Sequence, residues 1–346
     1  MTSFNPLAKD LDGILAGNRP YWRELKNKKI FITGGTGFIG CWLLESFLWA
    51  NQKLKLNASA TVLTRDANSF RRRAPHLAGQ RNIHLLQGDI RGFRFPGGNF
   101  SHIIHAAADT GIFQNENKPL SSLEYLFDGS KRVLDFSKRN KNAKFLLLSS
   151  GAVYGAQPAG LSRLLEDFTG APDPLSAHSA YAEGKRLAEL LCALYHKEYG
   201  LQTKIARCFT FVGPYMNLNG HHAAGNFIRD GLTGGSIEVK GDGKTVRSYF
   251  YAADLASWLW TILFKGKVCR PYNVGSDKEV TIRQLAEKVS DAFDSKPKIR
   301  INHRGFVGMG GNRYVPSVAR ARKELGLKQK FNIQESIQKT VDWYKR

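Results

Sequence analysis

From Lys29 onward, short apolar runs alternate with longer segments whose apolar residues recur at helical spacing. The runs are apolar almost throughout instead of at every second residue, as in KIFIT, ATVLT, HIIHAA and KFLLLSS. Runs of this kind are typical of strands buried on both faces, and the helical segments between them supply the crossovers that parallel strands require. The pattern therefore predicts an α/β fold, with a Rossmann-type doubly wound parallel sheet and a smaller C-terminal α/β substrate-binding region.

Three segments are expected along the chain. Residues 1–28 form an N-terminal helical extension, because Leu7, Leu11 and Ile14 share one helical face. We expect this helix to dock on the main domain, and a role in partner binding or dimerisation stays open. Residues 29–214 form the dinucleotide-binding domain, and residues 215–346 form most of the substrate-binding region.

Composition narrows the class of protein further. The four cysteines are scattered and the two adjacent histidines lack spaced partners, so we expect no disulfide framework, no metal site and a cytoplasmic location. No apolar run approaches the roughly 18 residues of a membrane span, and none resembles a secretory signal, so no membrane partner is expected. The net charge of +22 is spread over the whole chain, which favours phosphate-bearing small molecules over nucleic acid as partners.

A glycine-rich turn follows the first strand, in ITGGTGFIG. Gly34, Gly37 and Gly40 lie between a strand and a helix, where the backbone must turn tightly and approach a pyrophosphate closely. The first helical residues, Phe38 and Ile39, would then offer their amides to the phosphates. In this setting the glycine spacing predicts a dinucleotide site, NAD(P)(H).

The ends of the following strands supply the remaining contacts expected for the cofactor. Thr64 occupies the position of the acid that bonds the ribose in NAD proteins, and Arg65 follows it, which favours the 2′-phosphate of NADP(H). Asp66 still offers a carboxylate to the ribose. Further along, Asp89 and Ile90 could contact the adenine, and the small residues Ala106 and Ala107 would let the dinucleotide pass close to the backbone.

Tyr181 and Lys185 are four residues apart in SAYAEGK, and on a helix they share one face. An ammonium beside a phenol favours the phenolate and lowers the phenol's pKa, so Tyr181 is a candidate acid/base for a sugar oxygen. Ser150 ends the strand KFLLLSS and could hold the same oxygen by a hydrogen bond. Together with the glycine turn, these three residues predict a catalytic site.

With these motifs, the chain resembles the extended short-chain dehydrogenase/reductases, and more narrowly the NAD-dependent epimerase/dehydratase group that acts on nucleotide sugars. The resemblance runs from about Lys29 through TGGTGFIG, SSGAVYG, YAEGK, RCFTFVGP and GDGKTVRSYFYAADLA to RARKELGL. It implies the triad Ser150, Tyr181 and Lys185, with Lys185 also bonding the nicotinamide ribose. It further implies a nucleotide-sugar site, for which we expect substrate-binding roles for Asp109, Ser150, Thr210, Asn226 and Arg247.

Two departures from the family pattern narrow the expected reaction. Dehydratases of the family carry an Asp-Glu pair after the strand-end hydroxyl, and decarboxylases keep a glutamate there, but this chain has Gly151 and Ala152. Thr210 replaces the asparagine of many members. We expect an oxidoreductase of the 4-epimerase or 4-ketoreductase type, with Tyr181 as the acid/base. A non-catalytic NADP-binding sensor and a 4,6-dehydratase remain as alternatives, and a homodimer is the expected assembly.

Overall fold

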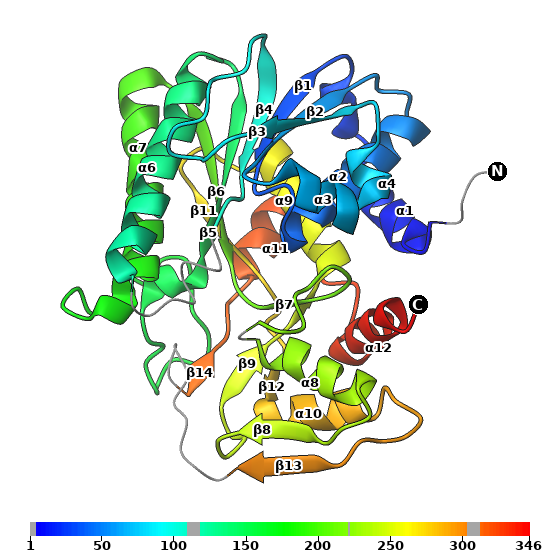
Figure 1. Ribbon diagram of the computed structural model, residues 1–346. Helices are drawn as coiled ribbons and strands as arrows, with labels where there is room; N and C mark the ends of the chain where they lie inside the picture. Colours follow the sequence, from blue (N-terminus) through cyan, green and yellow to red (C-terminus); the bar gives the residue numbers. More distant parts are fainter. Residues whose placement is uncertain (1–4, 109–117, 221, 303–311) are drawn as a thin grey trace. The chain divides into compact units, whose positions relative to one another are not determined.

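The computed structural model describes residues 5–108, 118–220, 222–302 and 312–346 (Figure 1). The chain divides into two compact units. The first unit consists of Met1–Val153, Pro172–Cys208 and Ala256–Tyr272, and the second consists of Tyr154–Ala171, Phe209–Leu255 and Asn273–Arg346. Neither unit is continuous in sequence, so the chain passes between them several times.

The first unit is built on a seven-stranded sheet with the order β11-β6-β5-β4-β1-β2-β3. All pairings from β6 across to β3 are parallel. This confirms the doubly wound α/β fold that the apolar runs predicted. The strands are β1 (Lys29–Thr33), β2 (Ser59–Thr64), β3 (Ile83–Gln87), β4 (Phe100–His105), β5 (Lys144–Ser150), β6 (Gln202–Cys208) and β11 (Pro271–Val274).

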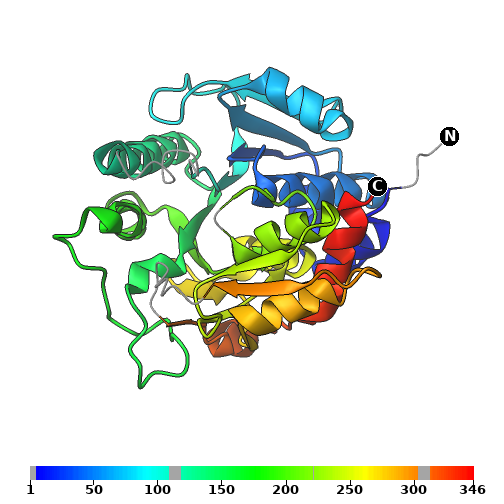
Figure 2. The same cartoon turned by 60° about the horizontal axis from the view of Figure 1, so that its bottom comes forward.

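Helices cover both faces of this sheet. α6 and α7 lie together on one face, and α2 and α9 lie on the other (Figures 1 and 2). The core under α6 is strongly aromatic, because the rings of Phe31, Phe93 and Phe136 pack against each other. The helices of this part are α2 (Phe38–Lys53), α3 (Ala67–Arg73), α4 (Pro75–Ala78), α6 (Pro119–Lys138), α7 (Ala180–Tyr199) and α9 (Ala252–Lys265).

The N-terminal segment is part of the first unit's core. α1 (Ala8–Gly17) packs against α2, and the buried Asn18 amide donates to the Ser257 carbonyl at 3.2 Å. Trp22, in the 3-10 turn Trp22–Leu25, lies with its ring centroid 4.7 Å from that of Trp260 on α9. The expected docking of this helix on the main domain is therefore what the structure shows.

The second unit carries short strands and helices (Figure 1). Its sheets pair β10 with β7, β9 with β12 and β14, and β13 with β8. Its elements are β7 (Phe211–Val212), α8 (Ala223–Leu232), β8 (Ile237–Lys240), β9 (Val246–Ser248), β10 (Phe250–Tyr251), β12 (Glu279–Thr281), α10 (Ile282–Ser290), β13 (Ile299–Asn302), β14 (Arg313–Tyr314), α11 (Ala319–Leu325) and α12 (Ile333–Tyr344).

Two runs pair in ways that their local pattern does not reveal. The run QTKIARCFTFVG divides into β6 and β7, which belong to different sheets. The run PYNVGS lies far along the chain, yet it forms β11, which adds to the edge of the main sheet beside β6. Local apolar pattern identifies a strand without identifying its neighbour, which is chosen by packing of distant segments.

Candidate active site

The glycine-rich turn joins β1 to α2 and lies against the end of β4. Gly34 has a left-handed φ of +69°, and a Cβ there would lie 2.6 Å from the backbone of Ala106. A Cβ on Gly40 would lie 2.3 Å from the Gly34 carbonyl oxygen. Gly37 differs, because its Cβ would meet only that same oxygen, at 3.4 Å. The fold itself therefore requires glycine at 34 and 40 but not at 37, where the space lies open in front of the helix N-terminus.

Buried hydrogen bonds hold β1 and β4 side by side at this turn. Thr33 Oγ1 and His105 Nδ1 are 2.8 Å apart, and the Ala107 N–H donates to Thr33 Oγ1 at 3.2 Å. The other ring nitrogen of His105 is 3.0 Å from Ser130 Oγ on α6. Burial lowers the pKa of His105 to about 3, so the ring stays neutral. This chain of contacts, which places Ala106 and Ala107 at the edge of the turn, was not predicted from the sequence.

A cluster of cations and an aromatic ring lies where β2 and β3 end. The guanidinium groups of Arg65 and Arg91 each lie 5.9 Å from the ring centroid of Tyr125. Asp89 accepts from Arg91 Nε at 2.8 Å, and this bond lowers the pKa of the Asp89 carboxyl. Asp66 caps α3 by accepting the Ser69 N–H at 2.8 Å, so its carboxylate is engaged by the backbone.

The remaining residues expected around the cofactor divide between core and surface. Ile90 is buried, and its side chain packs beneath Gly129 of α6. Phe38 and Ile39 are half-buried at the start of α2. Arg73, at the end of α3, donates to the Thr36 carbonyl within the glycine-rich turn. A further basic group therefore lies against the glycine-rich turn.

Ser150, Tyr181 and Lys185 come together where β5 ends. Ser150 Oγ accepts from the Ala152 N–H at 3.1 Å, and a hydrogen bond joins Ser150 to Tyr181 of α7. Lys185 Nζ donates to the Leu148 carbonyl at 2.8 Å. Because β5, β4 and β1 are neighbours in a parallel sheet, this group and the glycine-rich turn lie along the same carboxyl edge.

The electrostatics of the triad differ from the sequence expectation in one respect. Burial raises the pKa of the Tyr181 phenol, and the Ser150 hydrogen bond lowers it only in part. The spacing to Lys185 had predicted a lowered pKa, but desolvation dominates. Burial also lowers the pKa of Lys185 to about 8 and raises that of the Cys208 thiol to about 12. At neutral pH Tyr181 is therefore a neutral phenol and Cys208 a neutral thiol.

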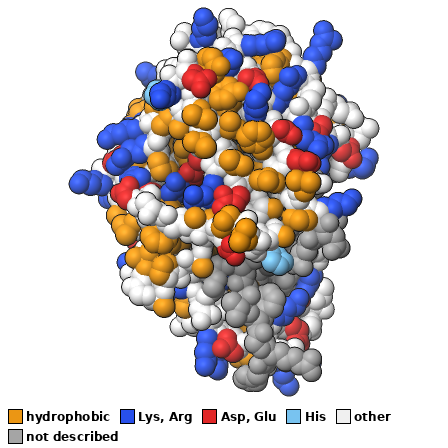
Figure 3. All heavy atoms as spheres, turned by 90° about the vertical axis from the view of Figure 1, so that its left-hand side faces the viewer, with side chains coloured by type: hydrophobic (Ala, Val, Ile, Leu, Met, Phe, Trp, Pro, Cys, Tyr) orange, Lys and Arg blue, Asp and Glu red, His pale blue; other side chains and the backbone are white. Residues whose placement is uncertain are grey.

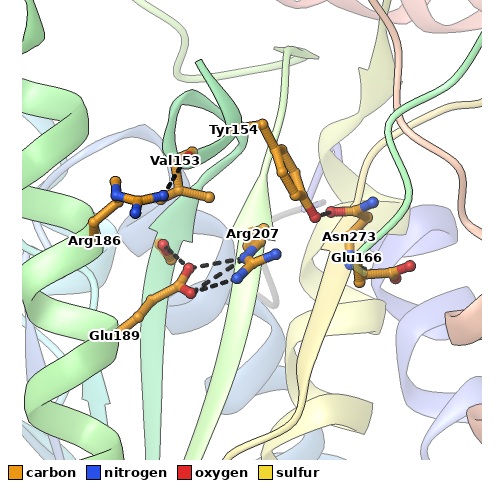
Figure 4. Close-up of polar contacts among 8 residues, drawn as sticks. Val153, Tyr154, Glu166, Arg186, Glu189, Arg207 and Asn273 are labelled. Carbon is orange, nitrogen blue, oxygen red and sulfur yellow. Dashed lines mark hydrogen bonds and ion pairs between the residues drawn. The ribbon is translucent and has the colours of Figure 1, made fainter. Parts of the chain in front are cut away.

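An ion pair beside the triad was not predicted from the sequence. Glu189 of α7 lies one turn beyond Lys185, and Arg207 of β6 donates to its carboxylate through Nε at 3.0 Å and Nη2 at 2.7 Å (Figure 4). The Ser149 hydroxyl donates to the same carboxylate at 2.5 Å. A glutamate four residues after Lys185 was the only signal in the sequence, and that spacing alone does not identify its partners.

The expected substrate residues of the C-terminal region lie in the second unit. The Thr210 carbonyl accepts from the Phe250 N–H at 3.0 Å, which joins the ends of β7 and β10. Arg247 of β9 is half-buried, and burial lowers its pKa while Tyr249 and Tyr314 oppose the shift. When the Asn226 side-chain amide is oriented so that its oxygen and its NH₂ group both have suitable partners, the NH₂ group donates to the Gly220 carbonyl at 3.0 Å. Asp109 lies outside the described residues.

In the part of the chain that the structure describes, no group of three or more His, Cys, Asp or Glu side chains could hold a metal ion. No helix in the described part of the chain combines the length and apolarity needed to cross a membrane.

Known proteins of one family resemble this chain over most of its length. Residues 30–275 match the model of the NAD dependent epimerase/dehydratase family. UDP-glucuronic acid decarboxylase 1 of Danio rerio is 27% identical over 323 residues, which cover 93% of this chain and 74% of that protein. UDP-glucuronic acid decarboxylase 6 of Arabidopsis thaliana is 28% identical over 311 residues, which cover 90% of this chain and 87% of the relative.

Solved structures share the fold. The epimerase Mth375 of Methanothermobacter thermautotrophicus superposes with a TM-score of 0.78 at 19% identity and covers 99% of this chain, with 96% of its own chain matched. UDP-glucuronic acid 4-epimerase of Bacillus cereus, solved with UDP-glucuronic acid and NAD, has a TM-score of 0.75 at 20% identity, covering 92% of this chain and 99% of its own. The family model spans most of the sheet and its carboxyl edge, and the chain belongs to the NAD-dependent epimerase/dehydratase family.

Proposed function

We propose that this protein is an oxidoreductase of nucleotide sugars, of the 4-epimerase or 4-ketoreductase type, with NADP(H) as the favoured cofactor. The observation that carries the proposal is the group Ser150, Tyr181 and Lys185 on the same sheet edge as the glycine-rich turn. The open space at Gly37 fits a dinucleotide pyrophosphate at the start of α2.

The chemistry follows from the states of these side chains. When bound, the nicotinamide supplies or accepts the hydride. Tyr181 then exchanges a proton with the sugar oxygen, and Ser150 orients that oxygen. A neutral phenol is the acid form, which is the form needed to protonate a carbonyl oxygen during reduction. Lys185 lies one helical turn from Tyr181, and the resemblance to the family implies that it bonds the nicotinamide ribose.

Elimination and decarboxylation require a group that moves protons at carbon. The turn after Ser150 is the 3-10 segment Gly151–Tyr154, which places no carboxylate at positions 151 and 152. This supports hydride transfer with proton exchange on oxygen over a 4,6-dehydratase. The relatives named decarboxylases are the reason to include UDP-glucuronic acid among the substrates tested.

The cofactor preference rests on the end of β2. Thr64 is buried where a ribose-binding acid would end the strand, and Asp66 is engaged in capping α3. Arg65 is exposed and lies over Tyr125, beside Arg91. Exposed guanidinium groups at this position suit a 2′-phosphate better than a ribose hydroxyl.

The first experiment identifies the cofactor. The purified protein is denatured and any released dinucleotide is identified by mass spectrometry. An empty site that binds NADPH at least about 10-fold more tightly than NADH supports a ketoreductase with a diffusible reductant. Tightly held NAD overturns the NADP preference and supports an epimerase that regenerates its cofactor in each cycle.

The second experiment tests the reaction. Nucleotide 4-ketosugars, UDP-glucose and UDP-glucuronic acid are each incubated with the protein and cofactor, and the nicotinamide absorbance and the sugar products are followed. Reduction of a ketosugar or interconversion of two epimers supports the proposal. Release of CO₂ from UDP-glucuronic acid would instead assign a decarboxylase. Dinucleotide binding without turnover of any of these substrates would support the alternative of a non-catalytic sensor.

The α6–α7 pair supports a homodimer as the assembly. Figure 3 shows the side of the molecule on which these helices lie, where hydrophobic side chains gather. Leu190, Leu194 and Tyr199 of α7 and Leu120 of α6 are all more than 40% exposed. Leu190 and Leu194 are one turn apart on α7, and exposed apolar side chains that gather on a helix are typical of a protein interface. We also propose a reducing compartment, the cytoplasm, because all four cysteines are free.

A further inference from the structure

Three side chains of α7 bind residues that flank Ser150 in sequence. Lys185 Nζ donates to the Leu148 carbonyl at 2.8 Å. Figure 4 shows Arg186, whose Nη1 donates to the Val153 carbonyl at 3.1 Å. The Glu189 carboxylate accepts from the Ser149 hydroxyl at 2.5 Å. Three hydrogen bonds therefore join α7, which carries Tyr181, to the end of β5 and the turn that follows it, where Ser150 lies.

Glu189 makes more hydrogen bonds than Lys185 or Arg186 in this group, because its carboxylate also accepts from Arg207. Arg207 and Ser149 are register partners in the β5–β6 pair, so one carboxylate joins α7 to both strands. The Arg207 and Glu189 side chains are only 15% and 13% exposed. A planar guanidinium that binds a carboxylate through two nitrogens restricts both distance and rotation, which a single bond does not.

The arrangement has a consequence for the triad. Tyr181 and Glu189 lie on the same helix, about two turns apart. A rotation or shift of α7 against β5 would change the Tyr181–Ser150 hydrogen bond, and the bonds to Ser149 and Arg207 oppose such movement. The pair also places a carboxylate near Lys185 without adding net charge, because Arg207 neutralises it.

We propose that Ser149, Glu189 and Arg207 form a positioning clamp that holds Tyr181 at hydrogen-bonding distance from Ser150. The clamp residues act through the catalytic pair, so they are positioning residues. The proposal rests on the proposed function, which makes Ser150 and Tyr181 catalytic. The alternative is an ion pair that stabilises the fold and has no effect on the geometry of the triad.

The test variants separate these two roles. A single substitution at Glu189 or Arg207 leaves one buried charge unpaired and can prevent folding. The double variant Glu189→Gln/Arg207→Gln removes both charges, and Ser149→Ala removes one hydrogen bond only. Ser149→Thr retains the hydroxyl and serves as the conservative rescue. Glu287→Gln is the matched control, because Glu287 also pairs with an arginine, Arg283, but on an exposed face of the second unit.

The first measurement is single-turnover hydride transfer, alongside the cofactor Kd and the thermal midpoint. For the double variant we expect a rate about 10- to 100-fold below that of the parent, with the cofactor Kd within about 2-fold, because small displacements of reacting groups cost rate. The rate of hydride transfer should also be lower in Ser149→Ala than in the parent, and it should return toward the parental value in Ser149→Thr. Parental rates in both the double variant and Ser149→Ala overturn the clamp, whatever their stability.

A second measurement needs no substrate. Tyrosines are labelled with ¹³C at Cζ, and the Tyr181 resonance is assigned as the one missing in Tyr181→Phe. Its chemical shift reports the hydrogen bonding of the phenol, which involves Ser150 of β5 and is also affected by the nearby Cys208 of β6. We expect this resonance to move in the double variant and in Ser149→Ala, but not in Glu287→Gln.

The two measurements distinguish failure of the clamp from failure of the proposed function. A Tyr181 resonance that moves, in a protein that turns over no nucleotide sugar, supports the clamp and rejects the proposed function. A resonance that keeps its parental position in every clamp variant rejects the clamp, even if the parent is an active reductase.

Discussion

At the scale of single residues, the chemistry depends on Tyr181. Its environment is set by burial, which raises the pKa of the phenol, and by Ser150, which lowers it. The phenol is therefore kept as a proton donor until a ligand changes its surroundings. Lys185 is buried with its ammonium on the Leu148 carbonyl, so it is oriented by the backbone of the strand that carries Ser150.

Tyr181→Phe removes the proton donor while keeping the ring. General acid catalysis contributes about 100- to 10,000-fold, so we expect single-turnover hydride transfer to fall by a factor in that range. The cofactor Kd should stay within about 2-fold of the parent value. A variant that keeps more than about a tenth of the parental rate would remove Tyr181 from the mechanism.

Gly37 and Gly40 provide a paired test of the glycine-rich turn. A Cβ on Gly40 would lie 2.3 Å from the Gly34 carbonyl oxygen, whereas one on Gly37 meets that oxygen only at 3.4 Å. Gly40→Ala should therefore destabilise the fold by about 1–3 kcal/mol, measured by denaturant unfolding. Gly37→Ala should leave stability unchanged and weaken dinucleotide binding by at least about 10-fold. Equal effects of the two substitutions on stability would contradict this assignment.

At the scale of secondary-structure elements, α7 combines the most roles. It carries Tyr181 and Lys185, binds β5 and β6 through Glu189, and packs against α6. Its outer face bears Leu190 and Leu194, which are exposed. The same helix therefore presents one face to the site and another to solvent in the single chain.

Leu190→Glu tests the proposed dimer. A carboxylate at a position that is 53% exposed in one chain should leave the chain folded but prevent burial of α7 against a second copy. We expect the parent to have the mass of a dimer and the variant that of a monomer by light scattering. Leu175→Glu is the control, because Leu175 is 94% exposed and lies outside the two helices. A monomeric parent rejects the dimer.

Lys204 lies in β6, where its ammonium donates to the Gly266 carbonyl at 3.0 Å and burial lowers its pKa from 10.5 to about 8. Between about pH 8 and pH 10.5, Lys204 is mostly protonated in the unfolded chain and mostly neutral in the folded chain. The contribution of Lys204 to stability must then increase as pH rises from about 8 to 10.5. The free energy of unfolding of the parent, minus that of Lys204→Met, should rise over this range and be constant from pH 6 to 7. A difference that is flat throughout would contradict the buried charge.

At the scale of the whole molecule, the N-terminal segment belongs to the folded unit and is not an appendage. Leu11, Ile14, Trp22 and Leu25 are at most 2% exposed. The Asn18 side chain bonds α9 from this segment, with the Thr261 hydroxyl donating to its oxygen at 2.7 Å.

Deletion of residues 1–28 is therefore expected to abolish folding. Exposing several fully buried large side chains costs about 1.5–3 kcal/mol for each, and a typical domain has only about 5–15 kcal/mol of stability. Circular dichroism and thermal unfolding of the truncated chain provide the check. A truncated chain that unfolds cooperatively within about 5 °C of the parent would show instead that the segment is dispensable.

Much of the fold could be predicted from the sequence, because its signals are local. Nearly continuous apolar runs identified the strands of the main sheet, and helical spacing identified the helices between them. The sequence was a poorer guide to which strands pair with each other. The apolar pattern of QTKIARCFTFVG does not reveal that β6 and β7 belong to different sheets, and that of PYNVGS does not reveal that β11 lies beside β6, because pairing depends on segments that are distant in sequence.

The sequence by itself determined the chemical groups: the glycine-rich turn, the strand-end Ser150, the Tyr181–Lys185 spacing and the missing carboxylates at 151 and 152. The structure brings the first three to one sheet edge, as the order of strands requires. Only the tertiary structure decided which glycine leaves room for a ligand, that Asp89 pairs with Arg91, and that Glu189 binds both Ser149 and Arg207. It also reversed the expected direction of the Tyr181 pKa shift. The physical reason is the same in each case: residue types and spacings are local, whereas burial, strand register and side-chain pairing arise only when distant segments pack together.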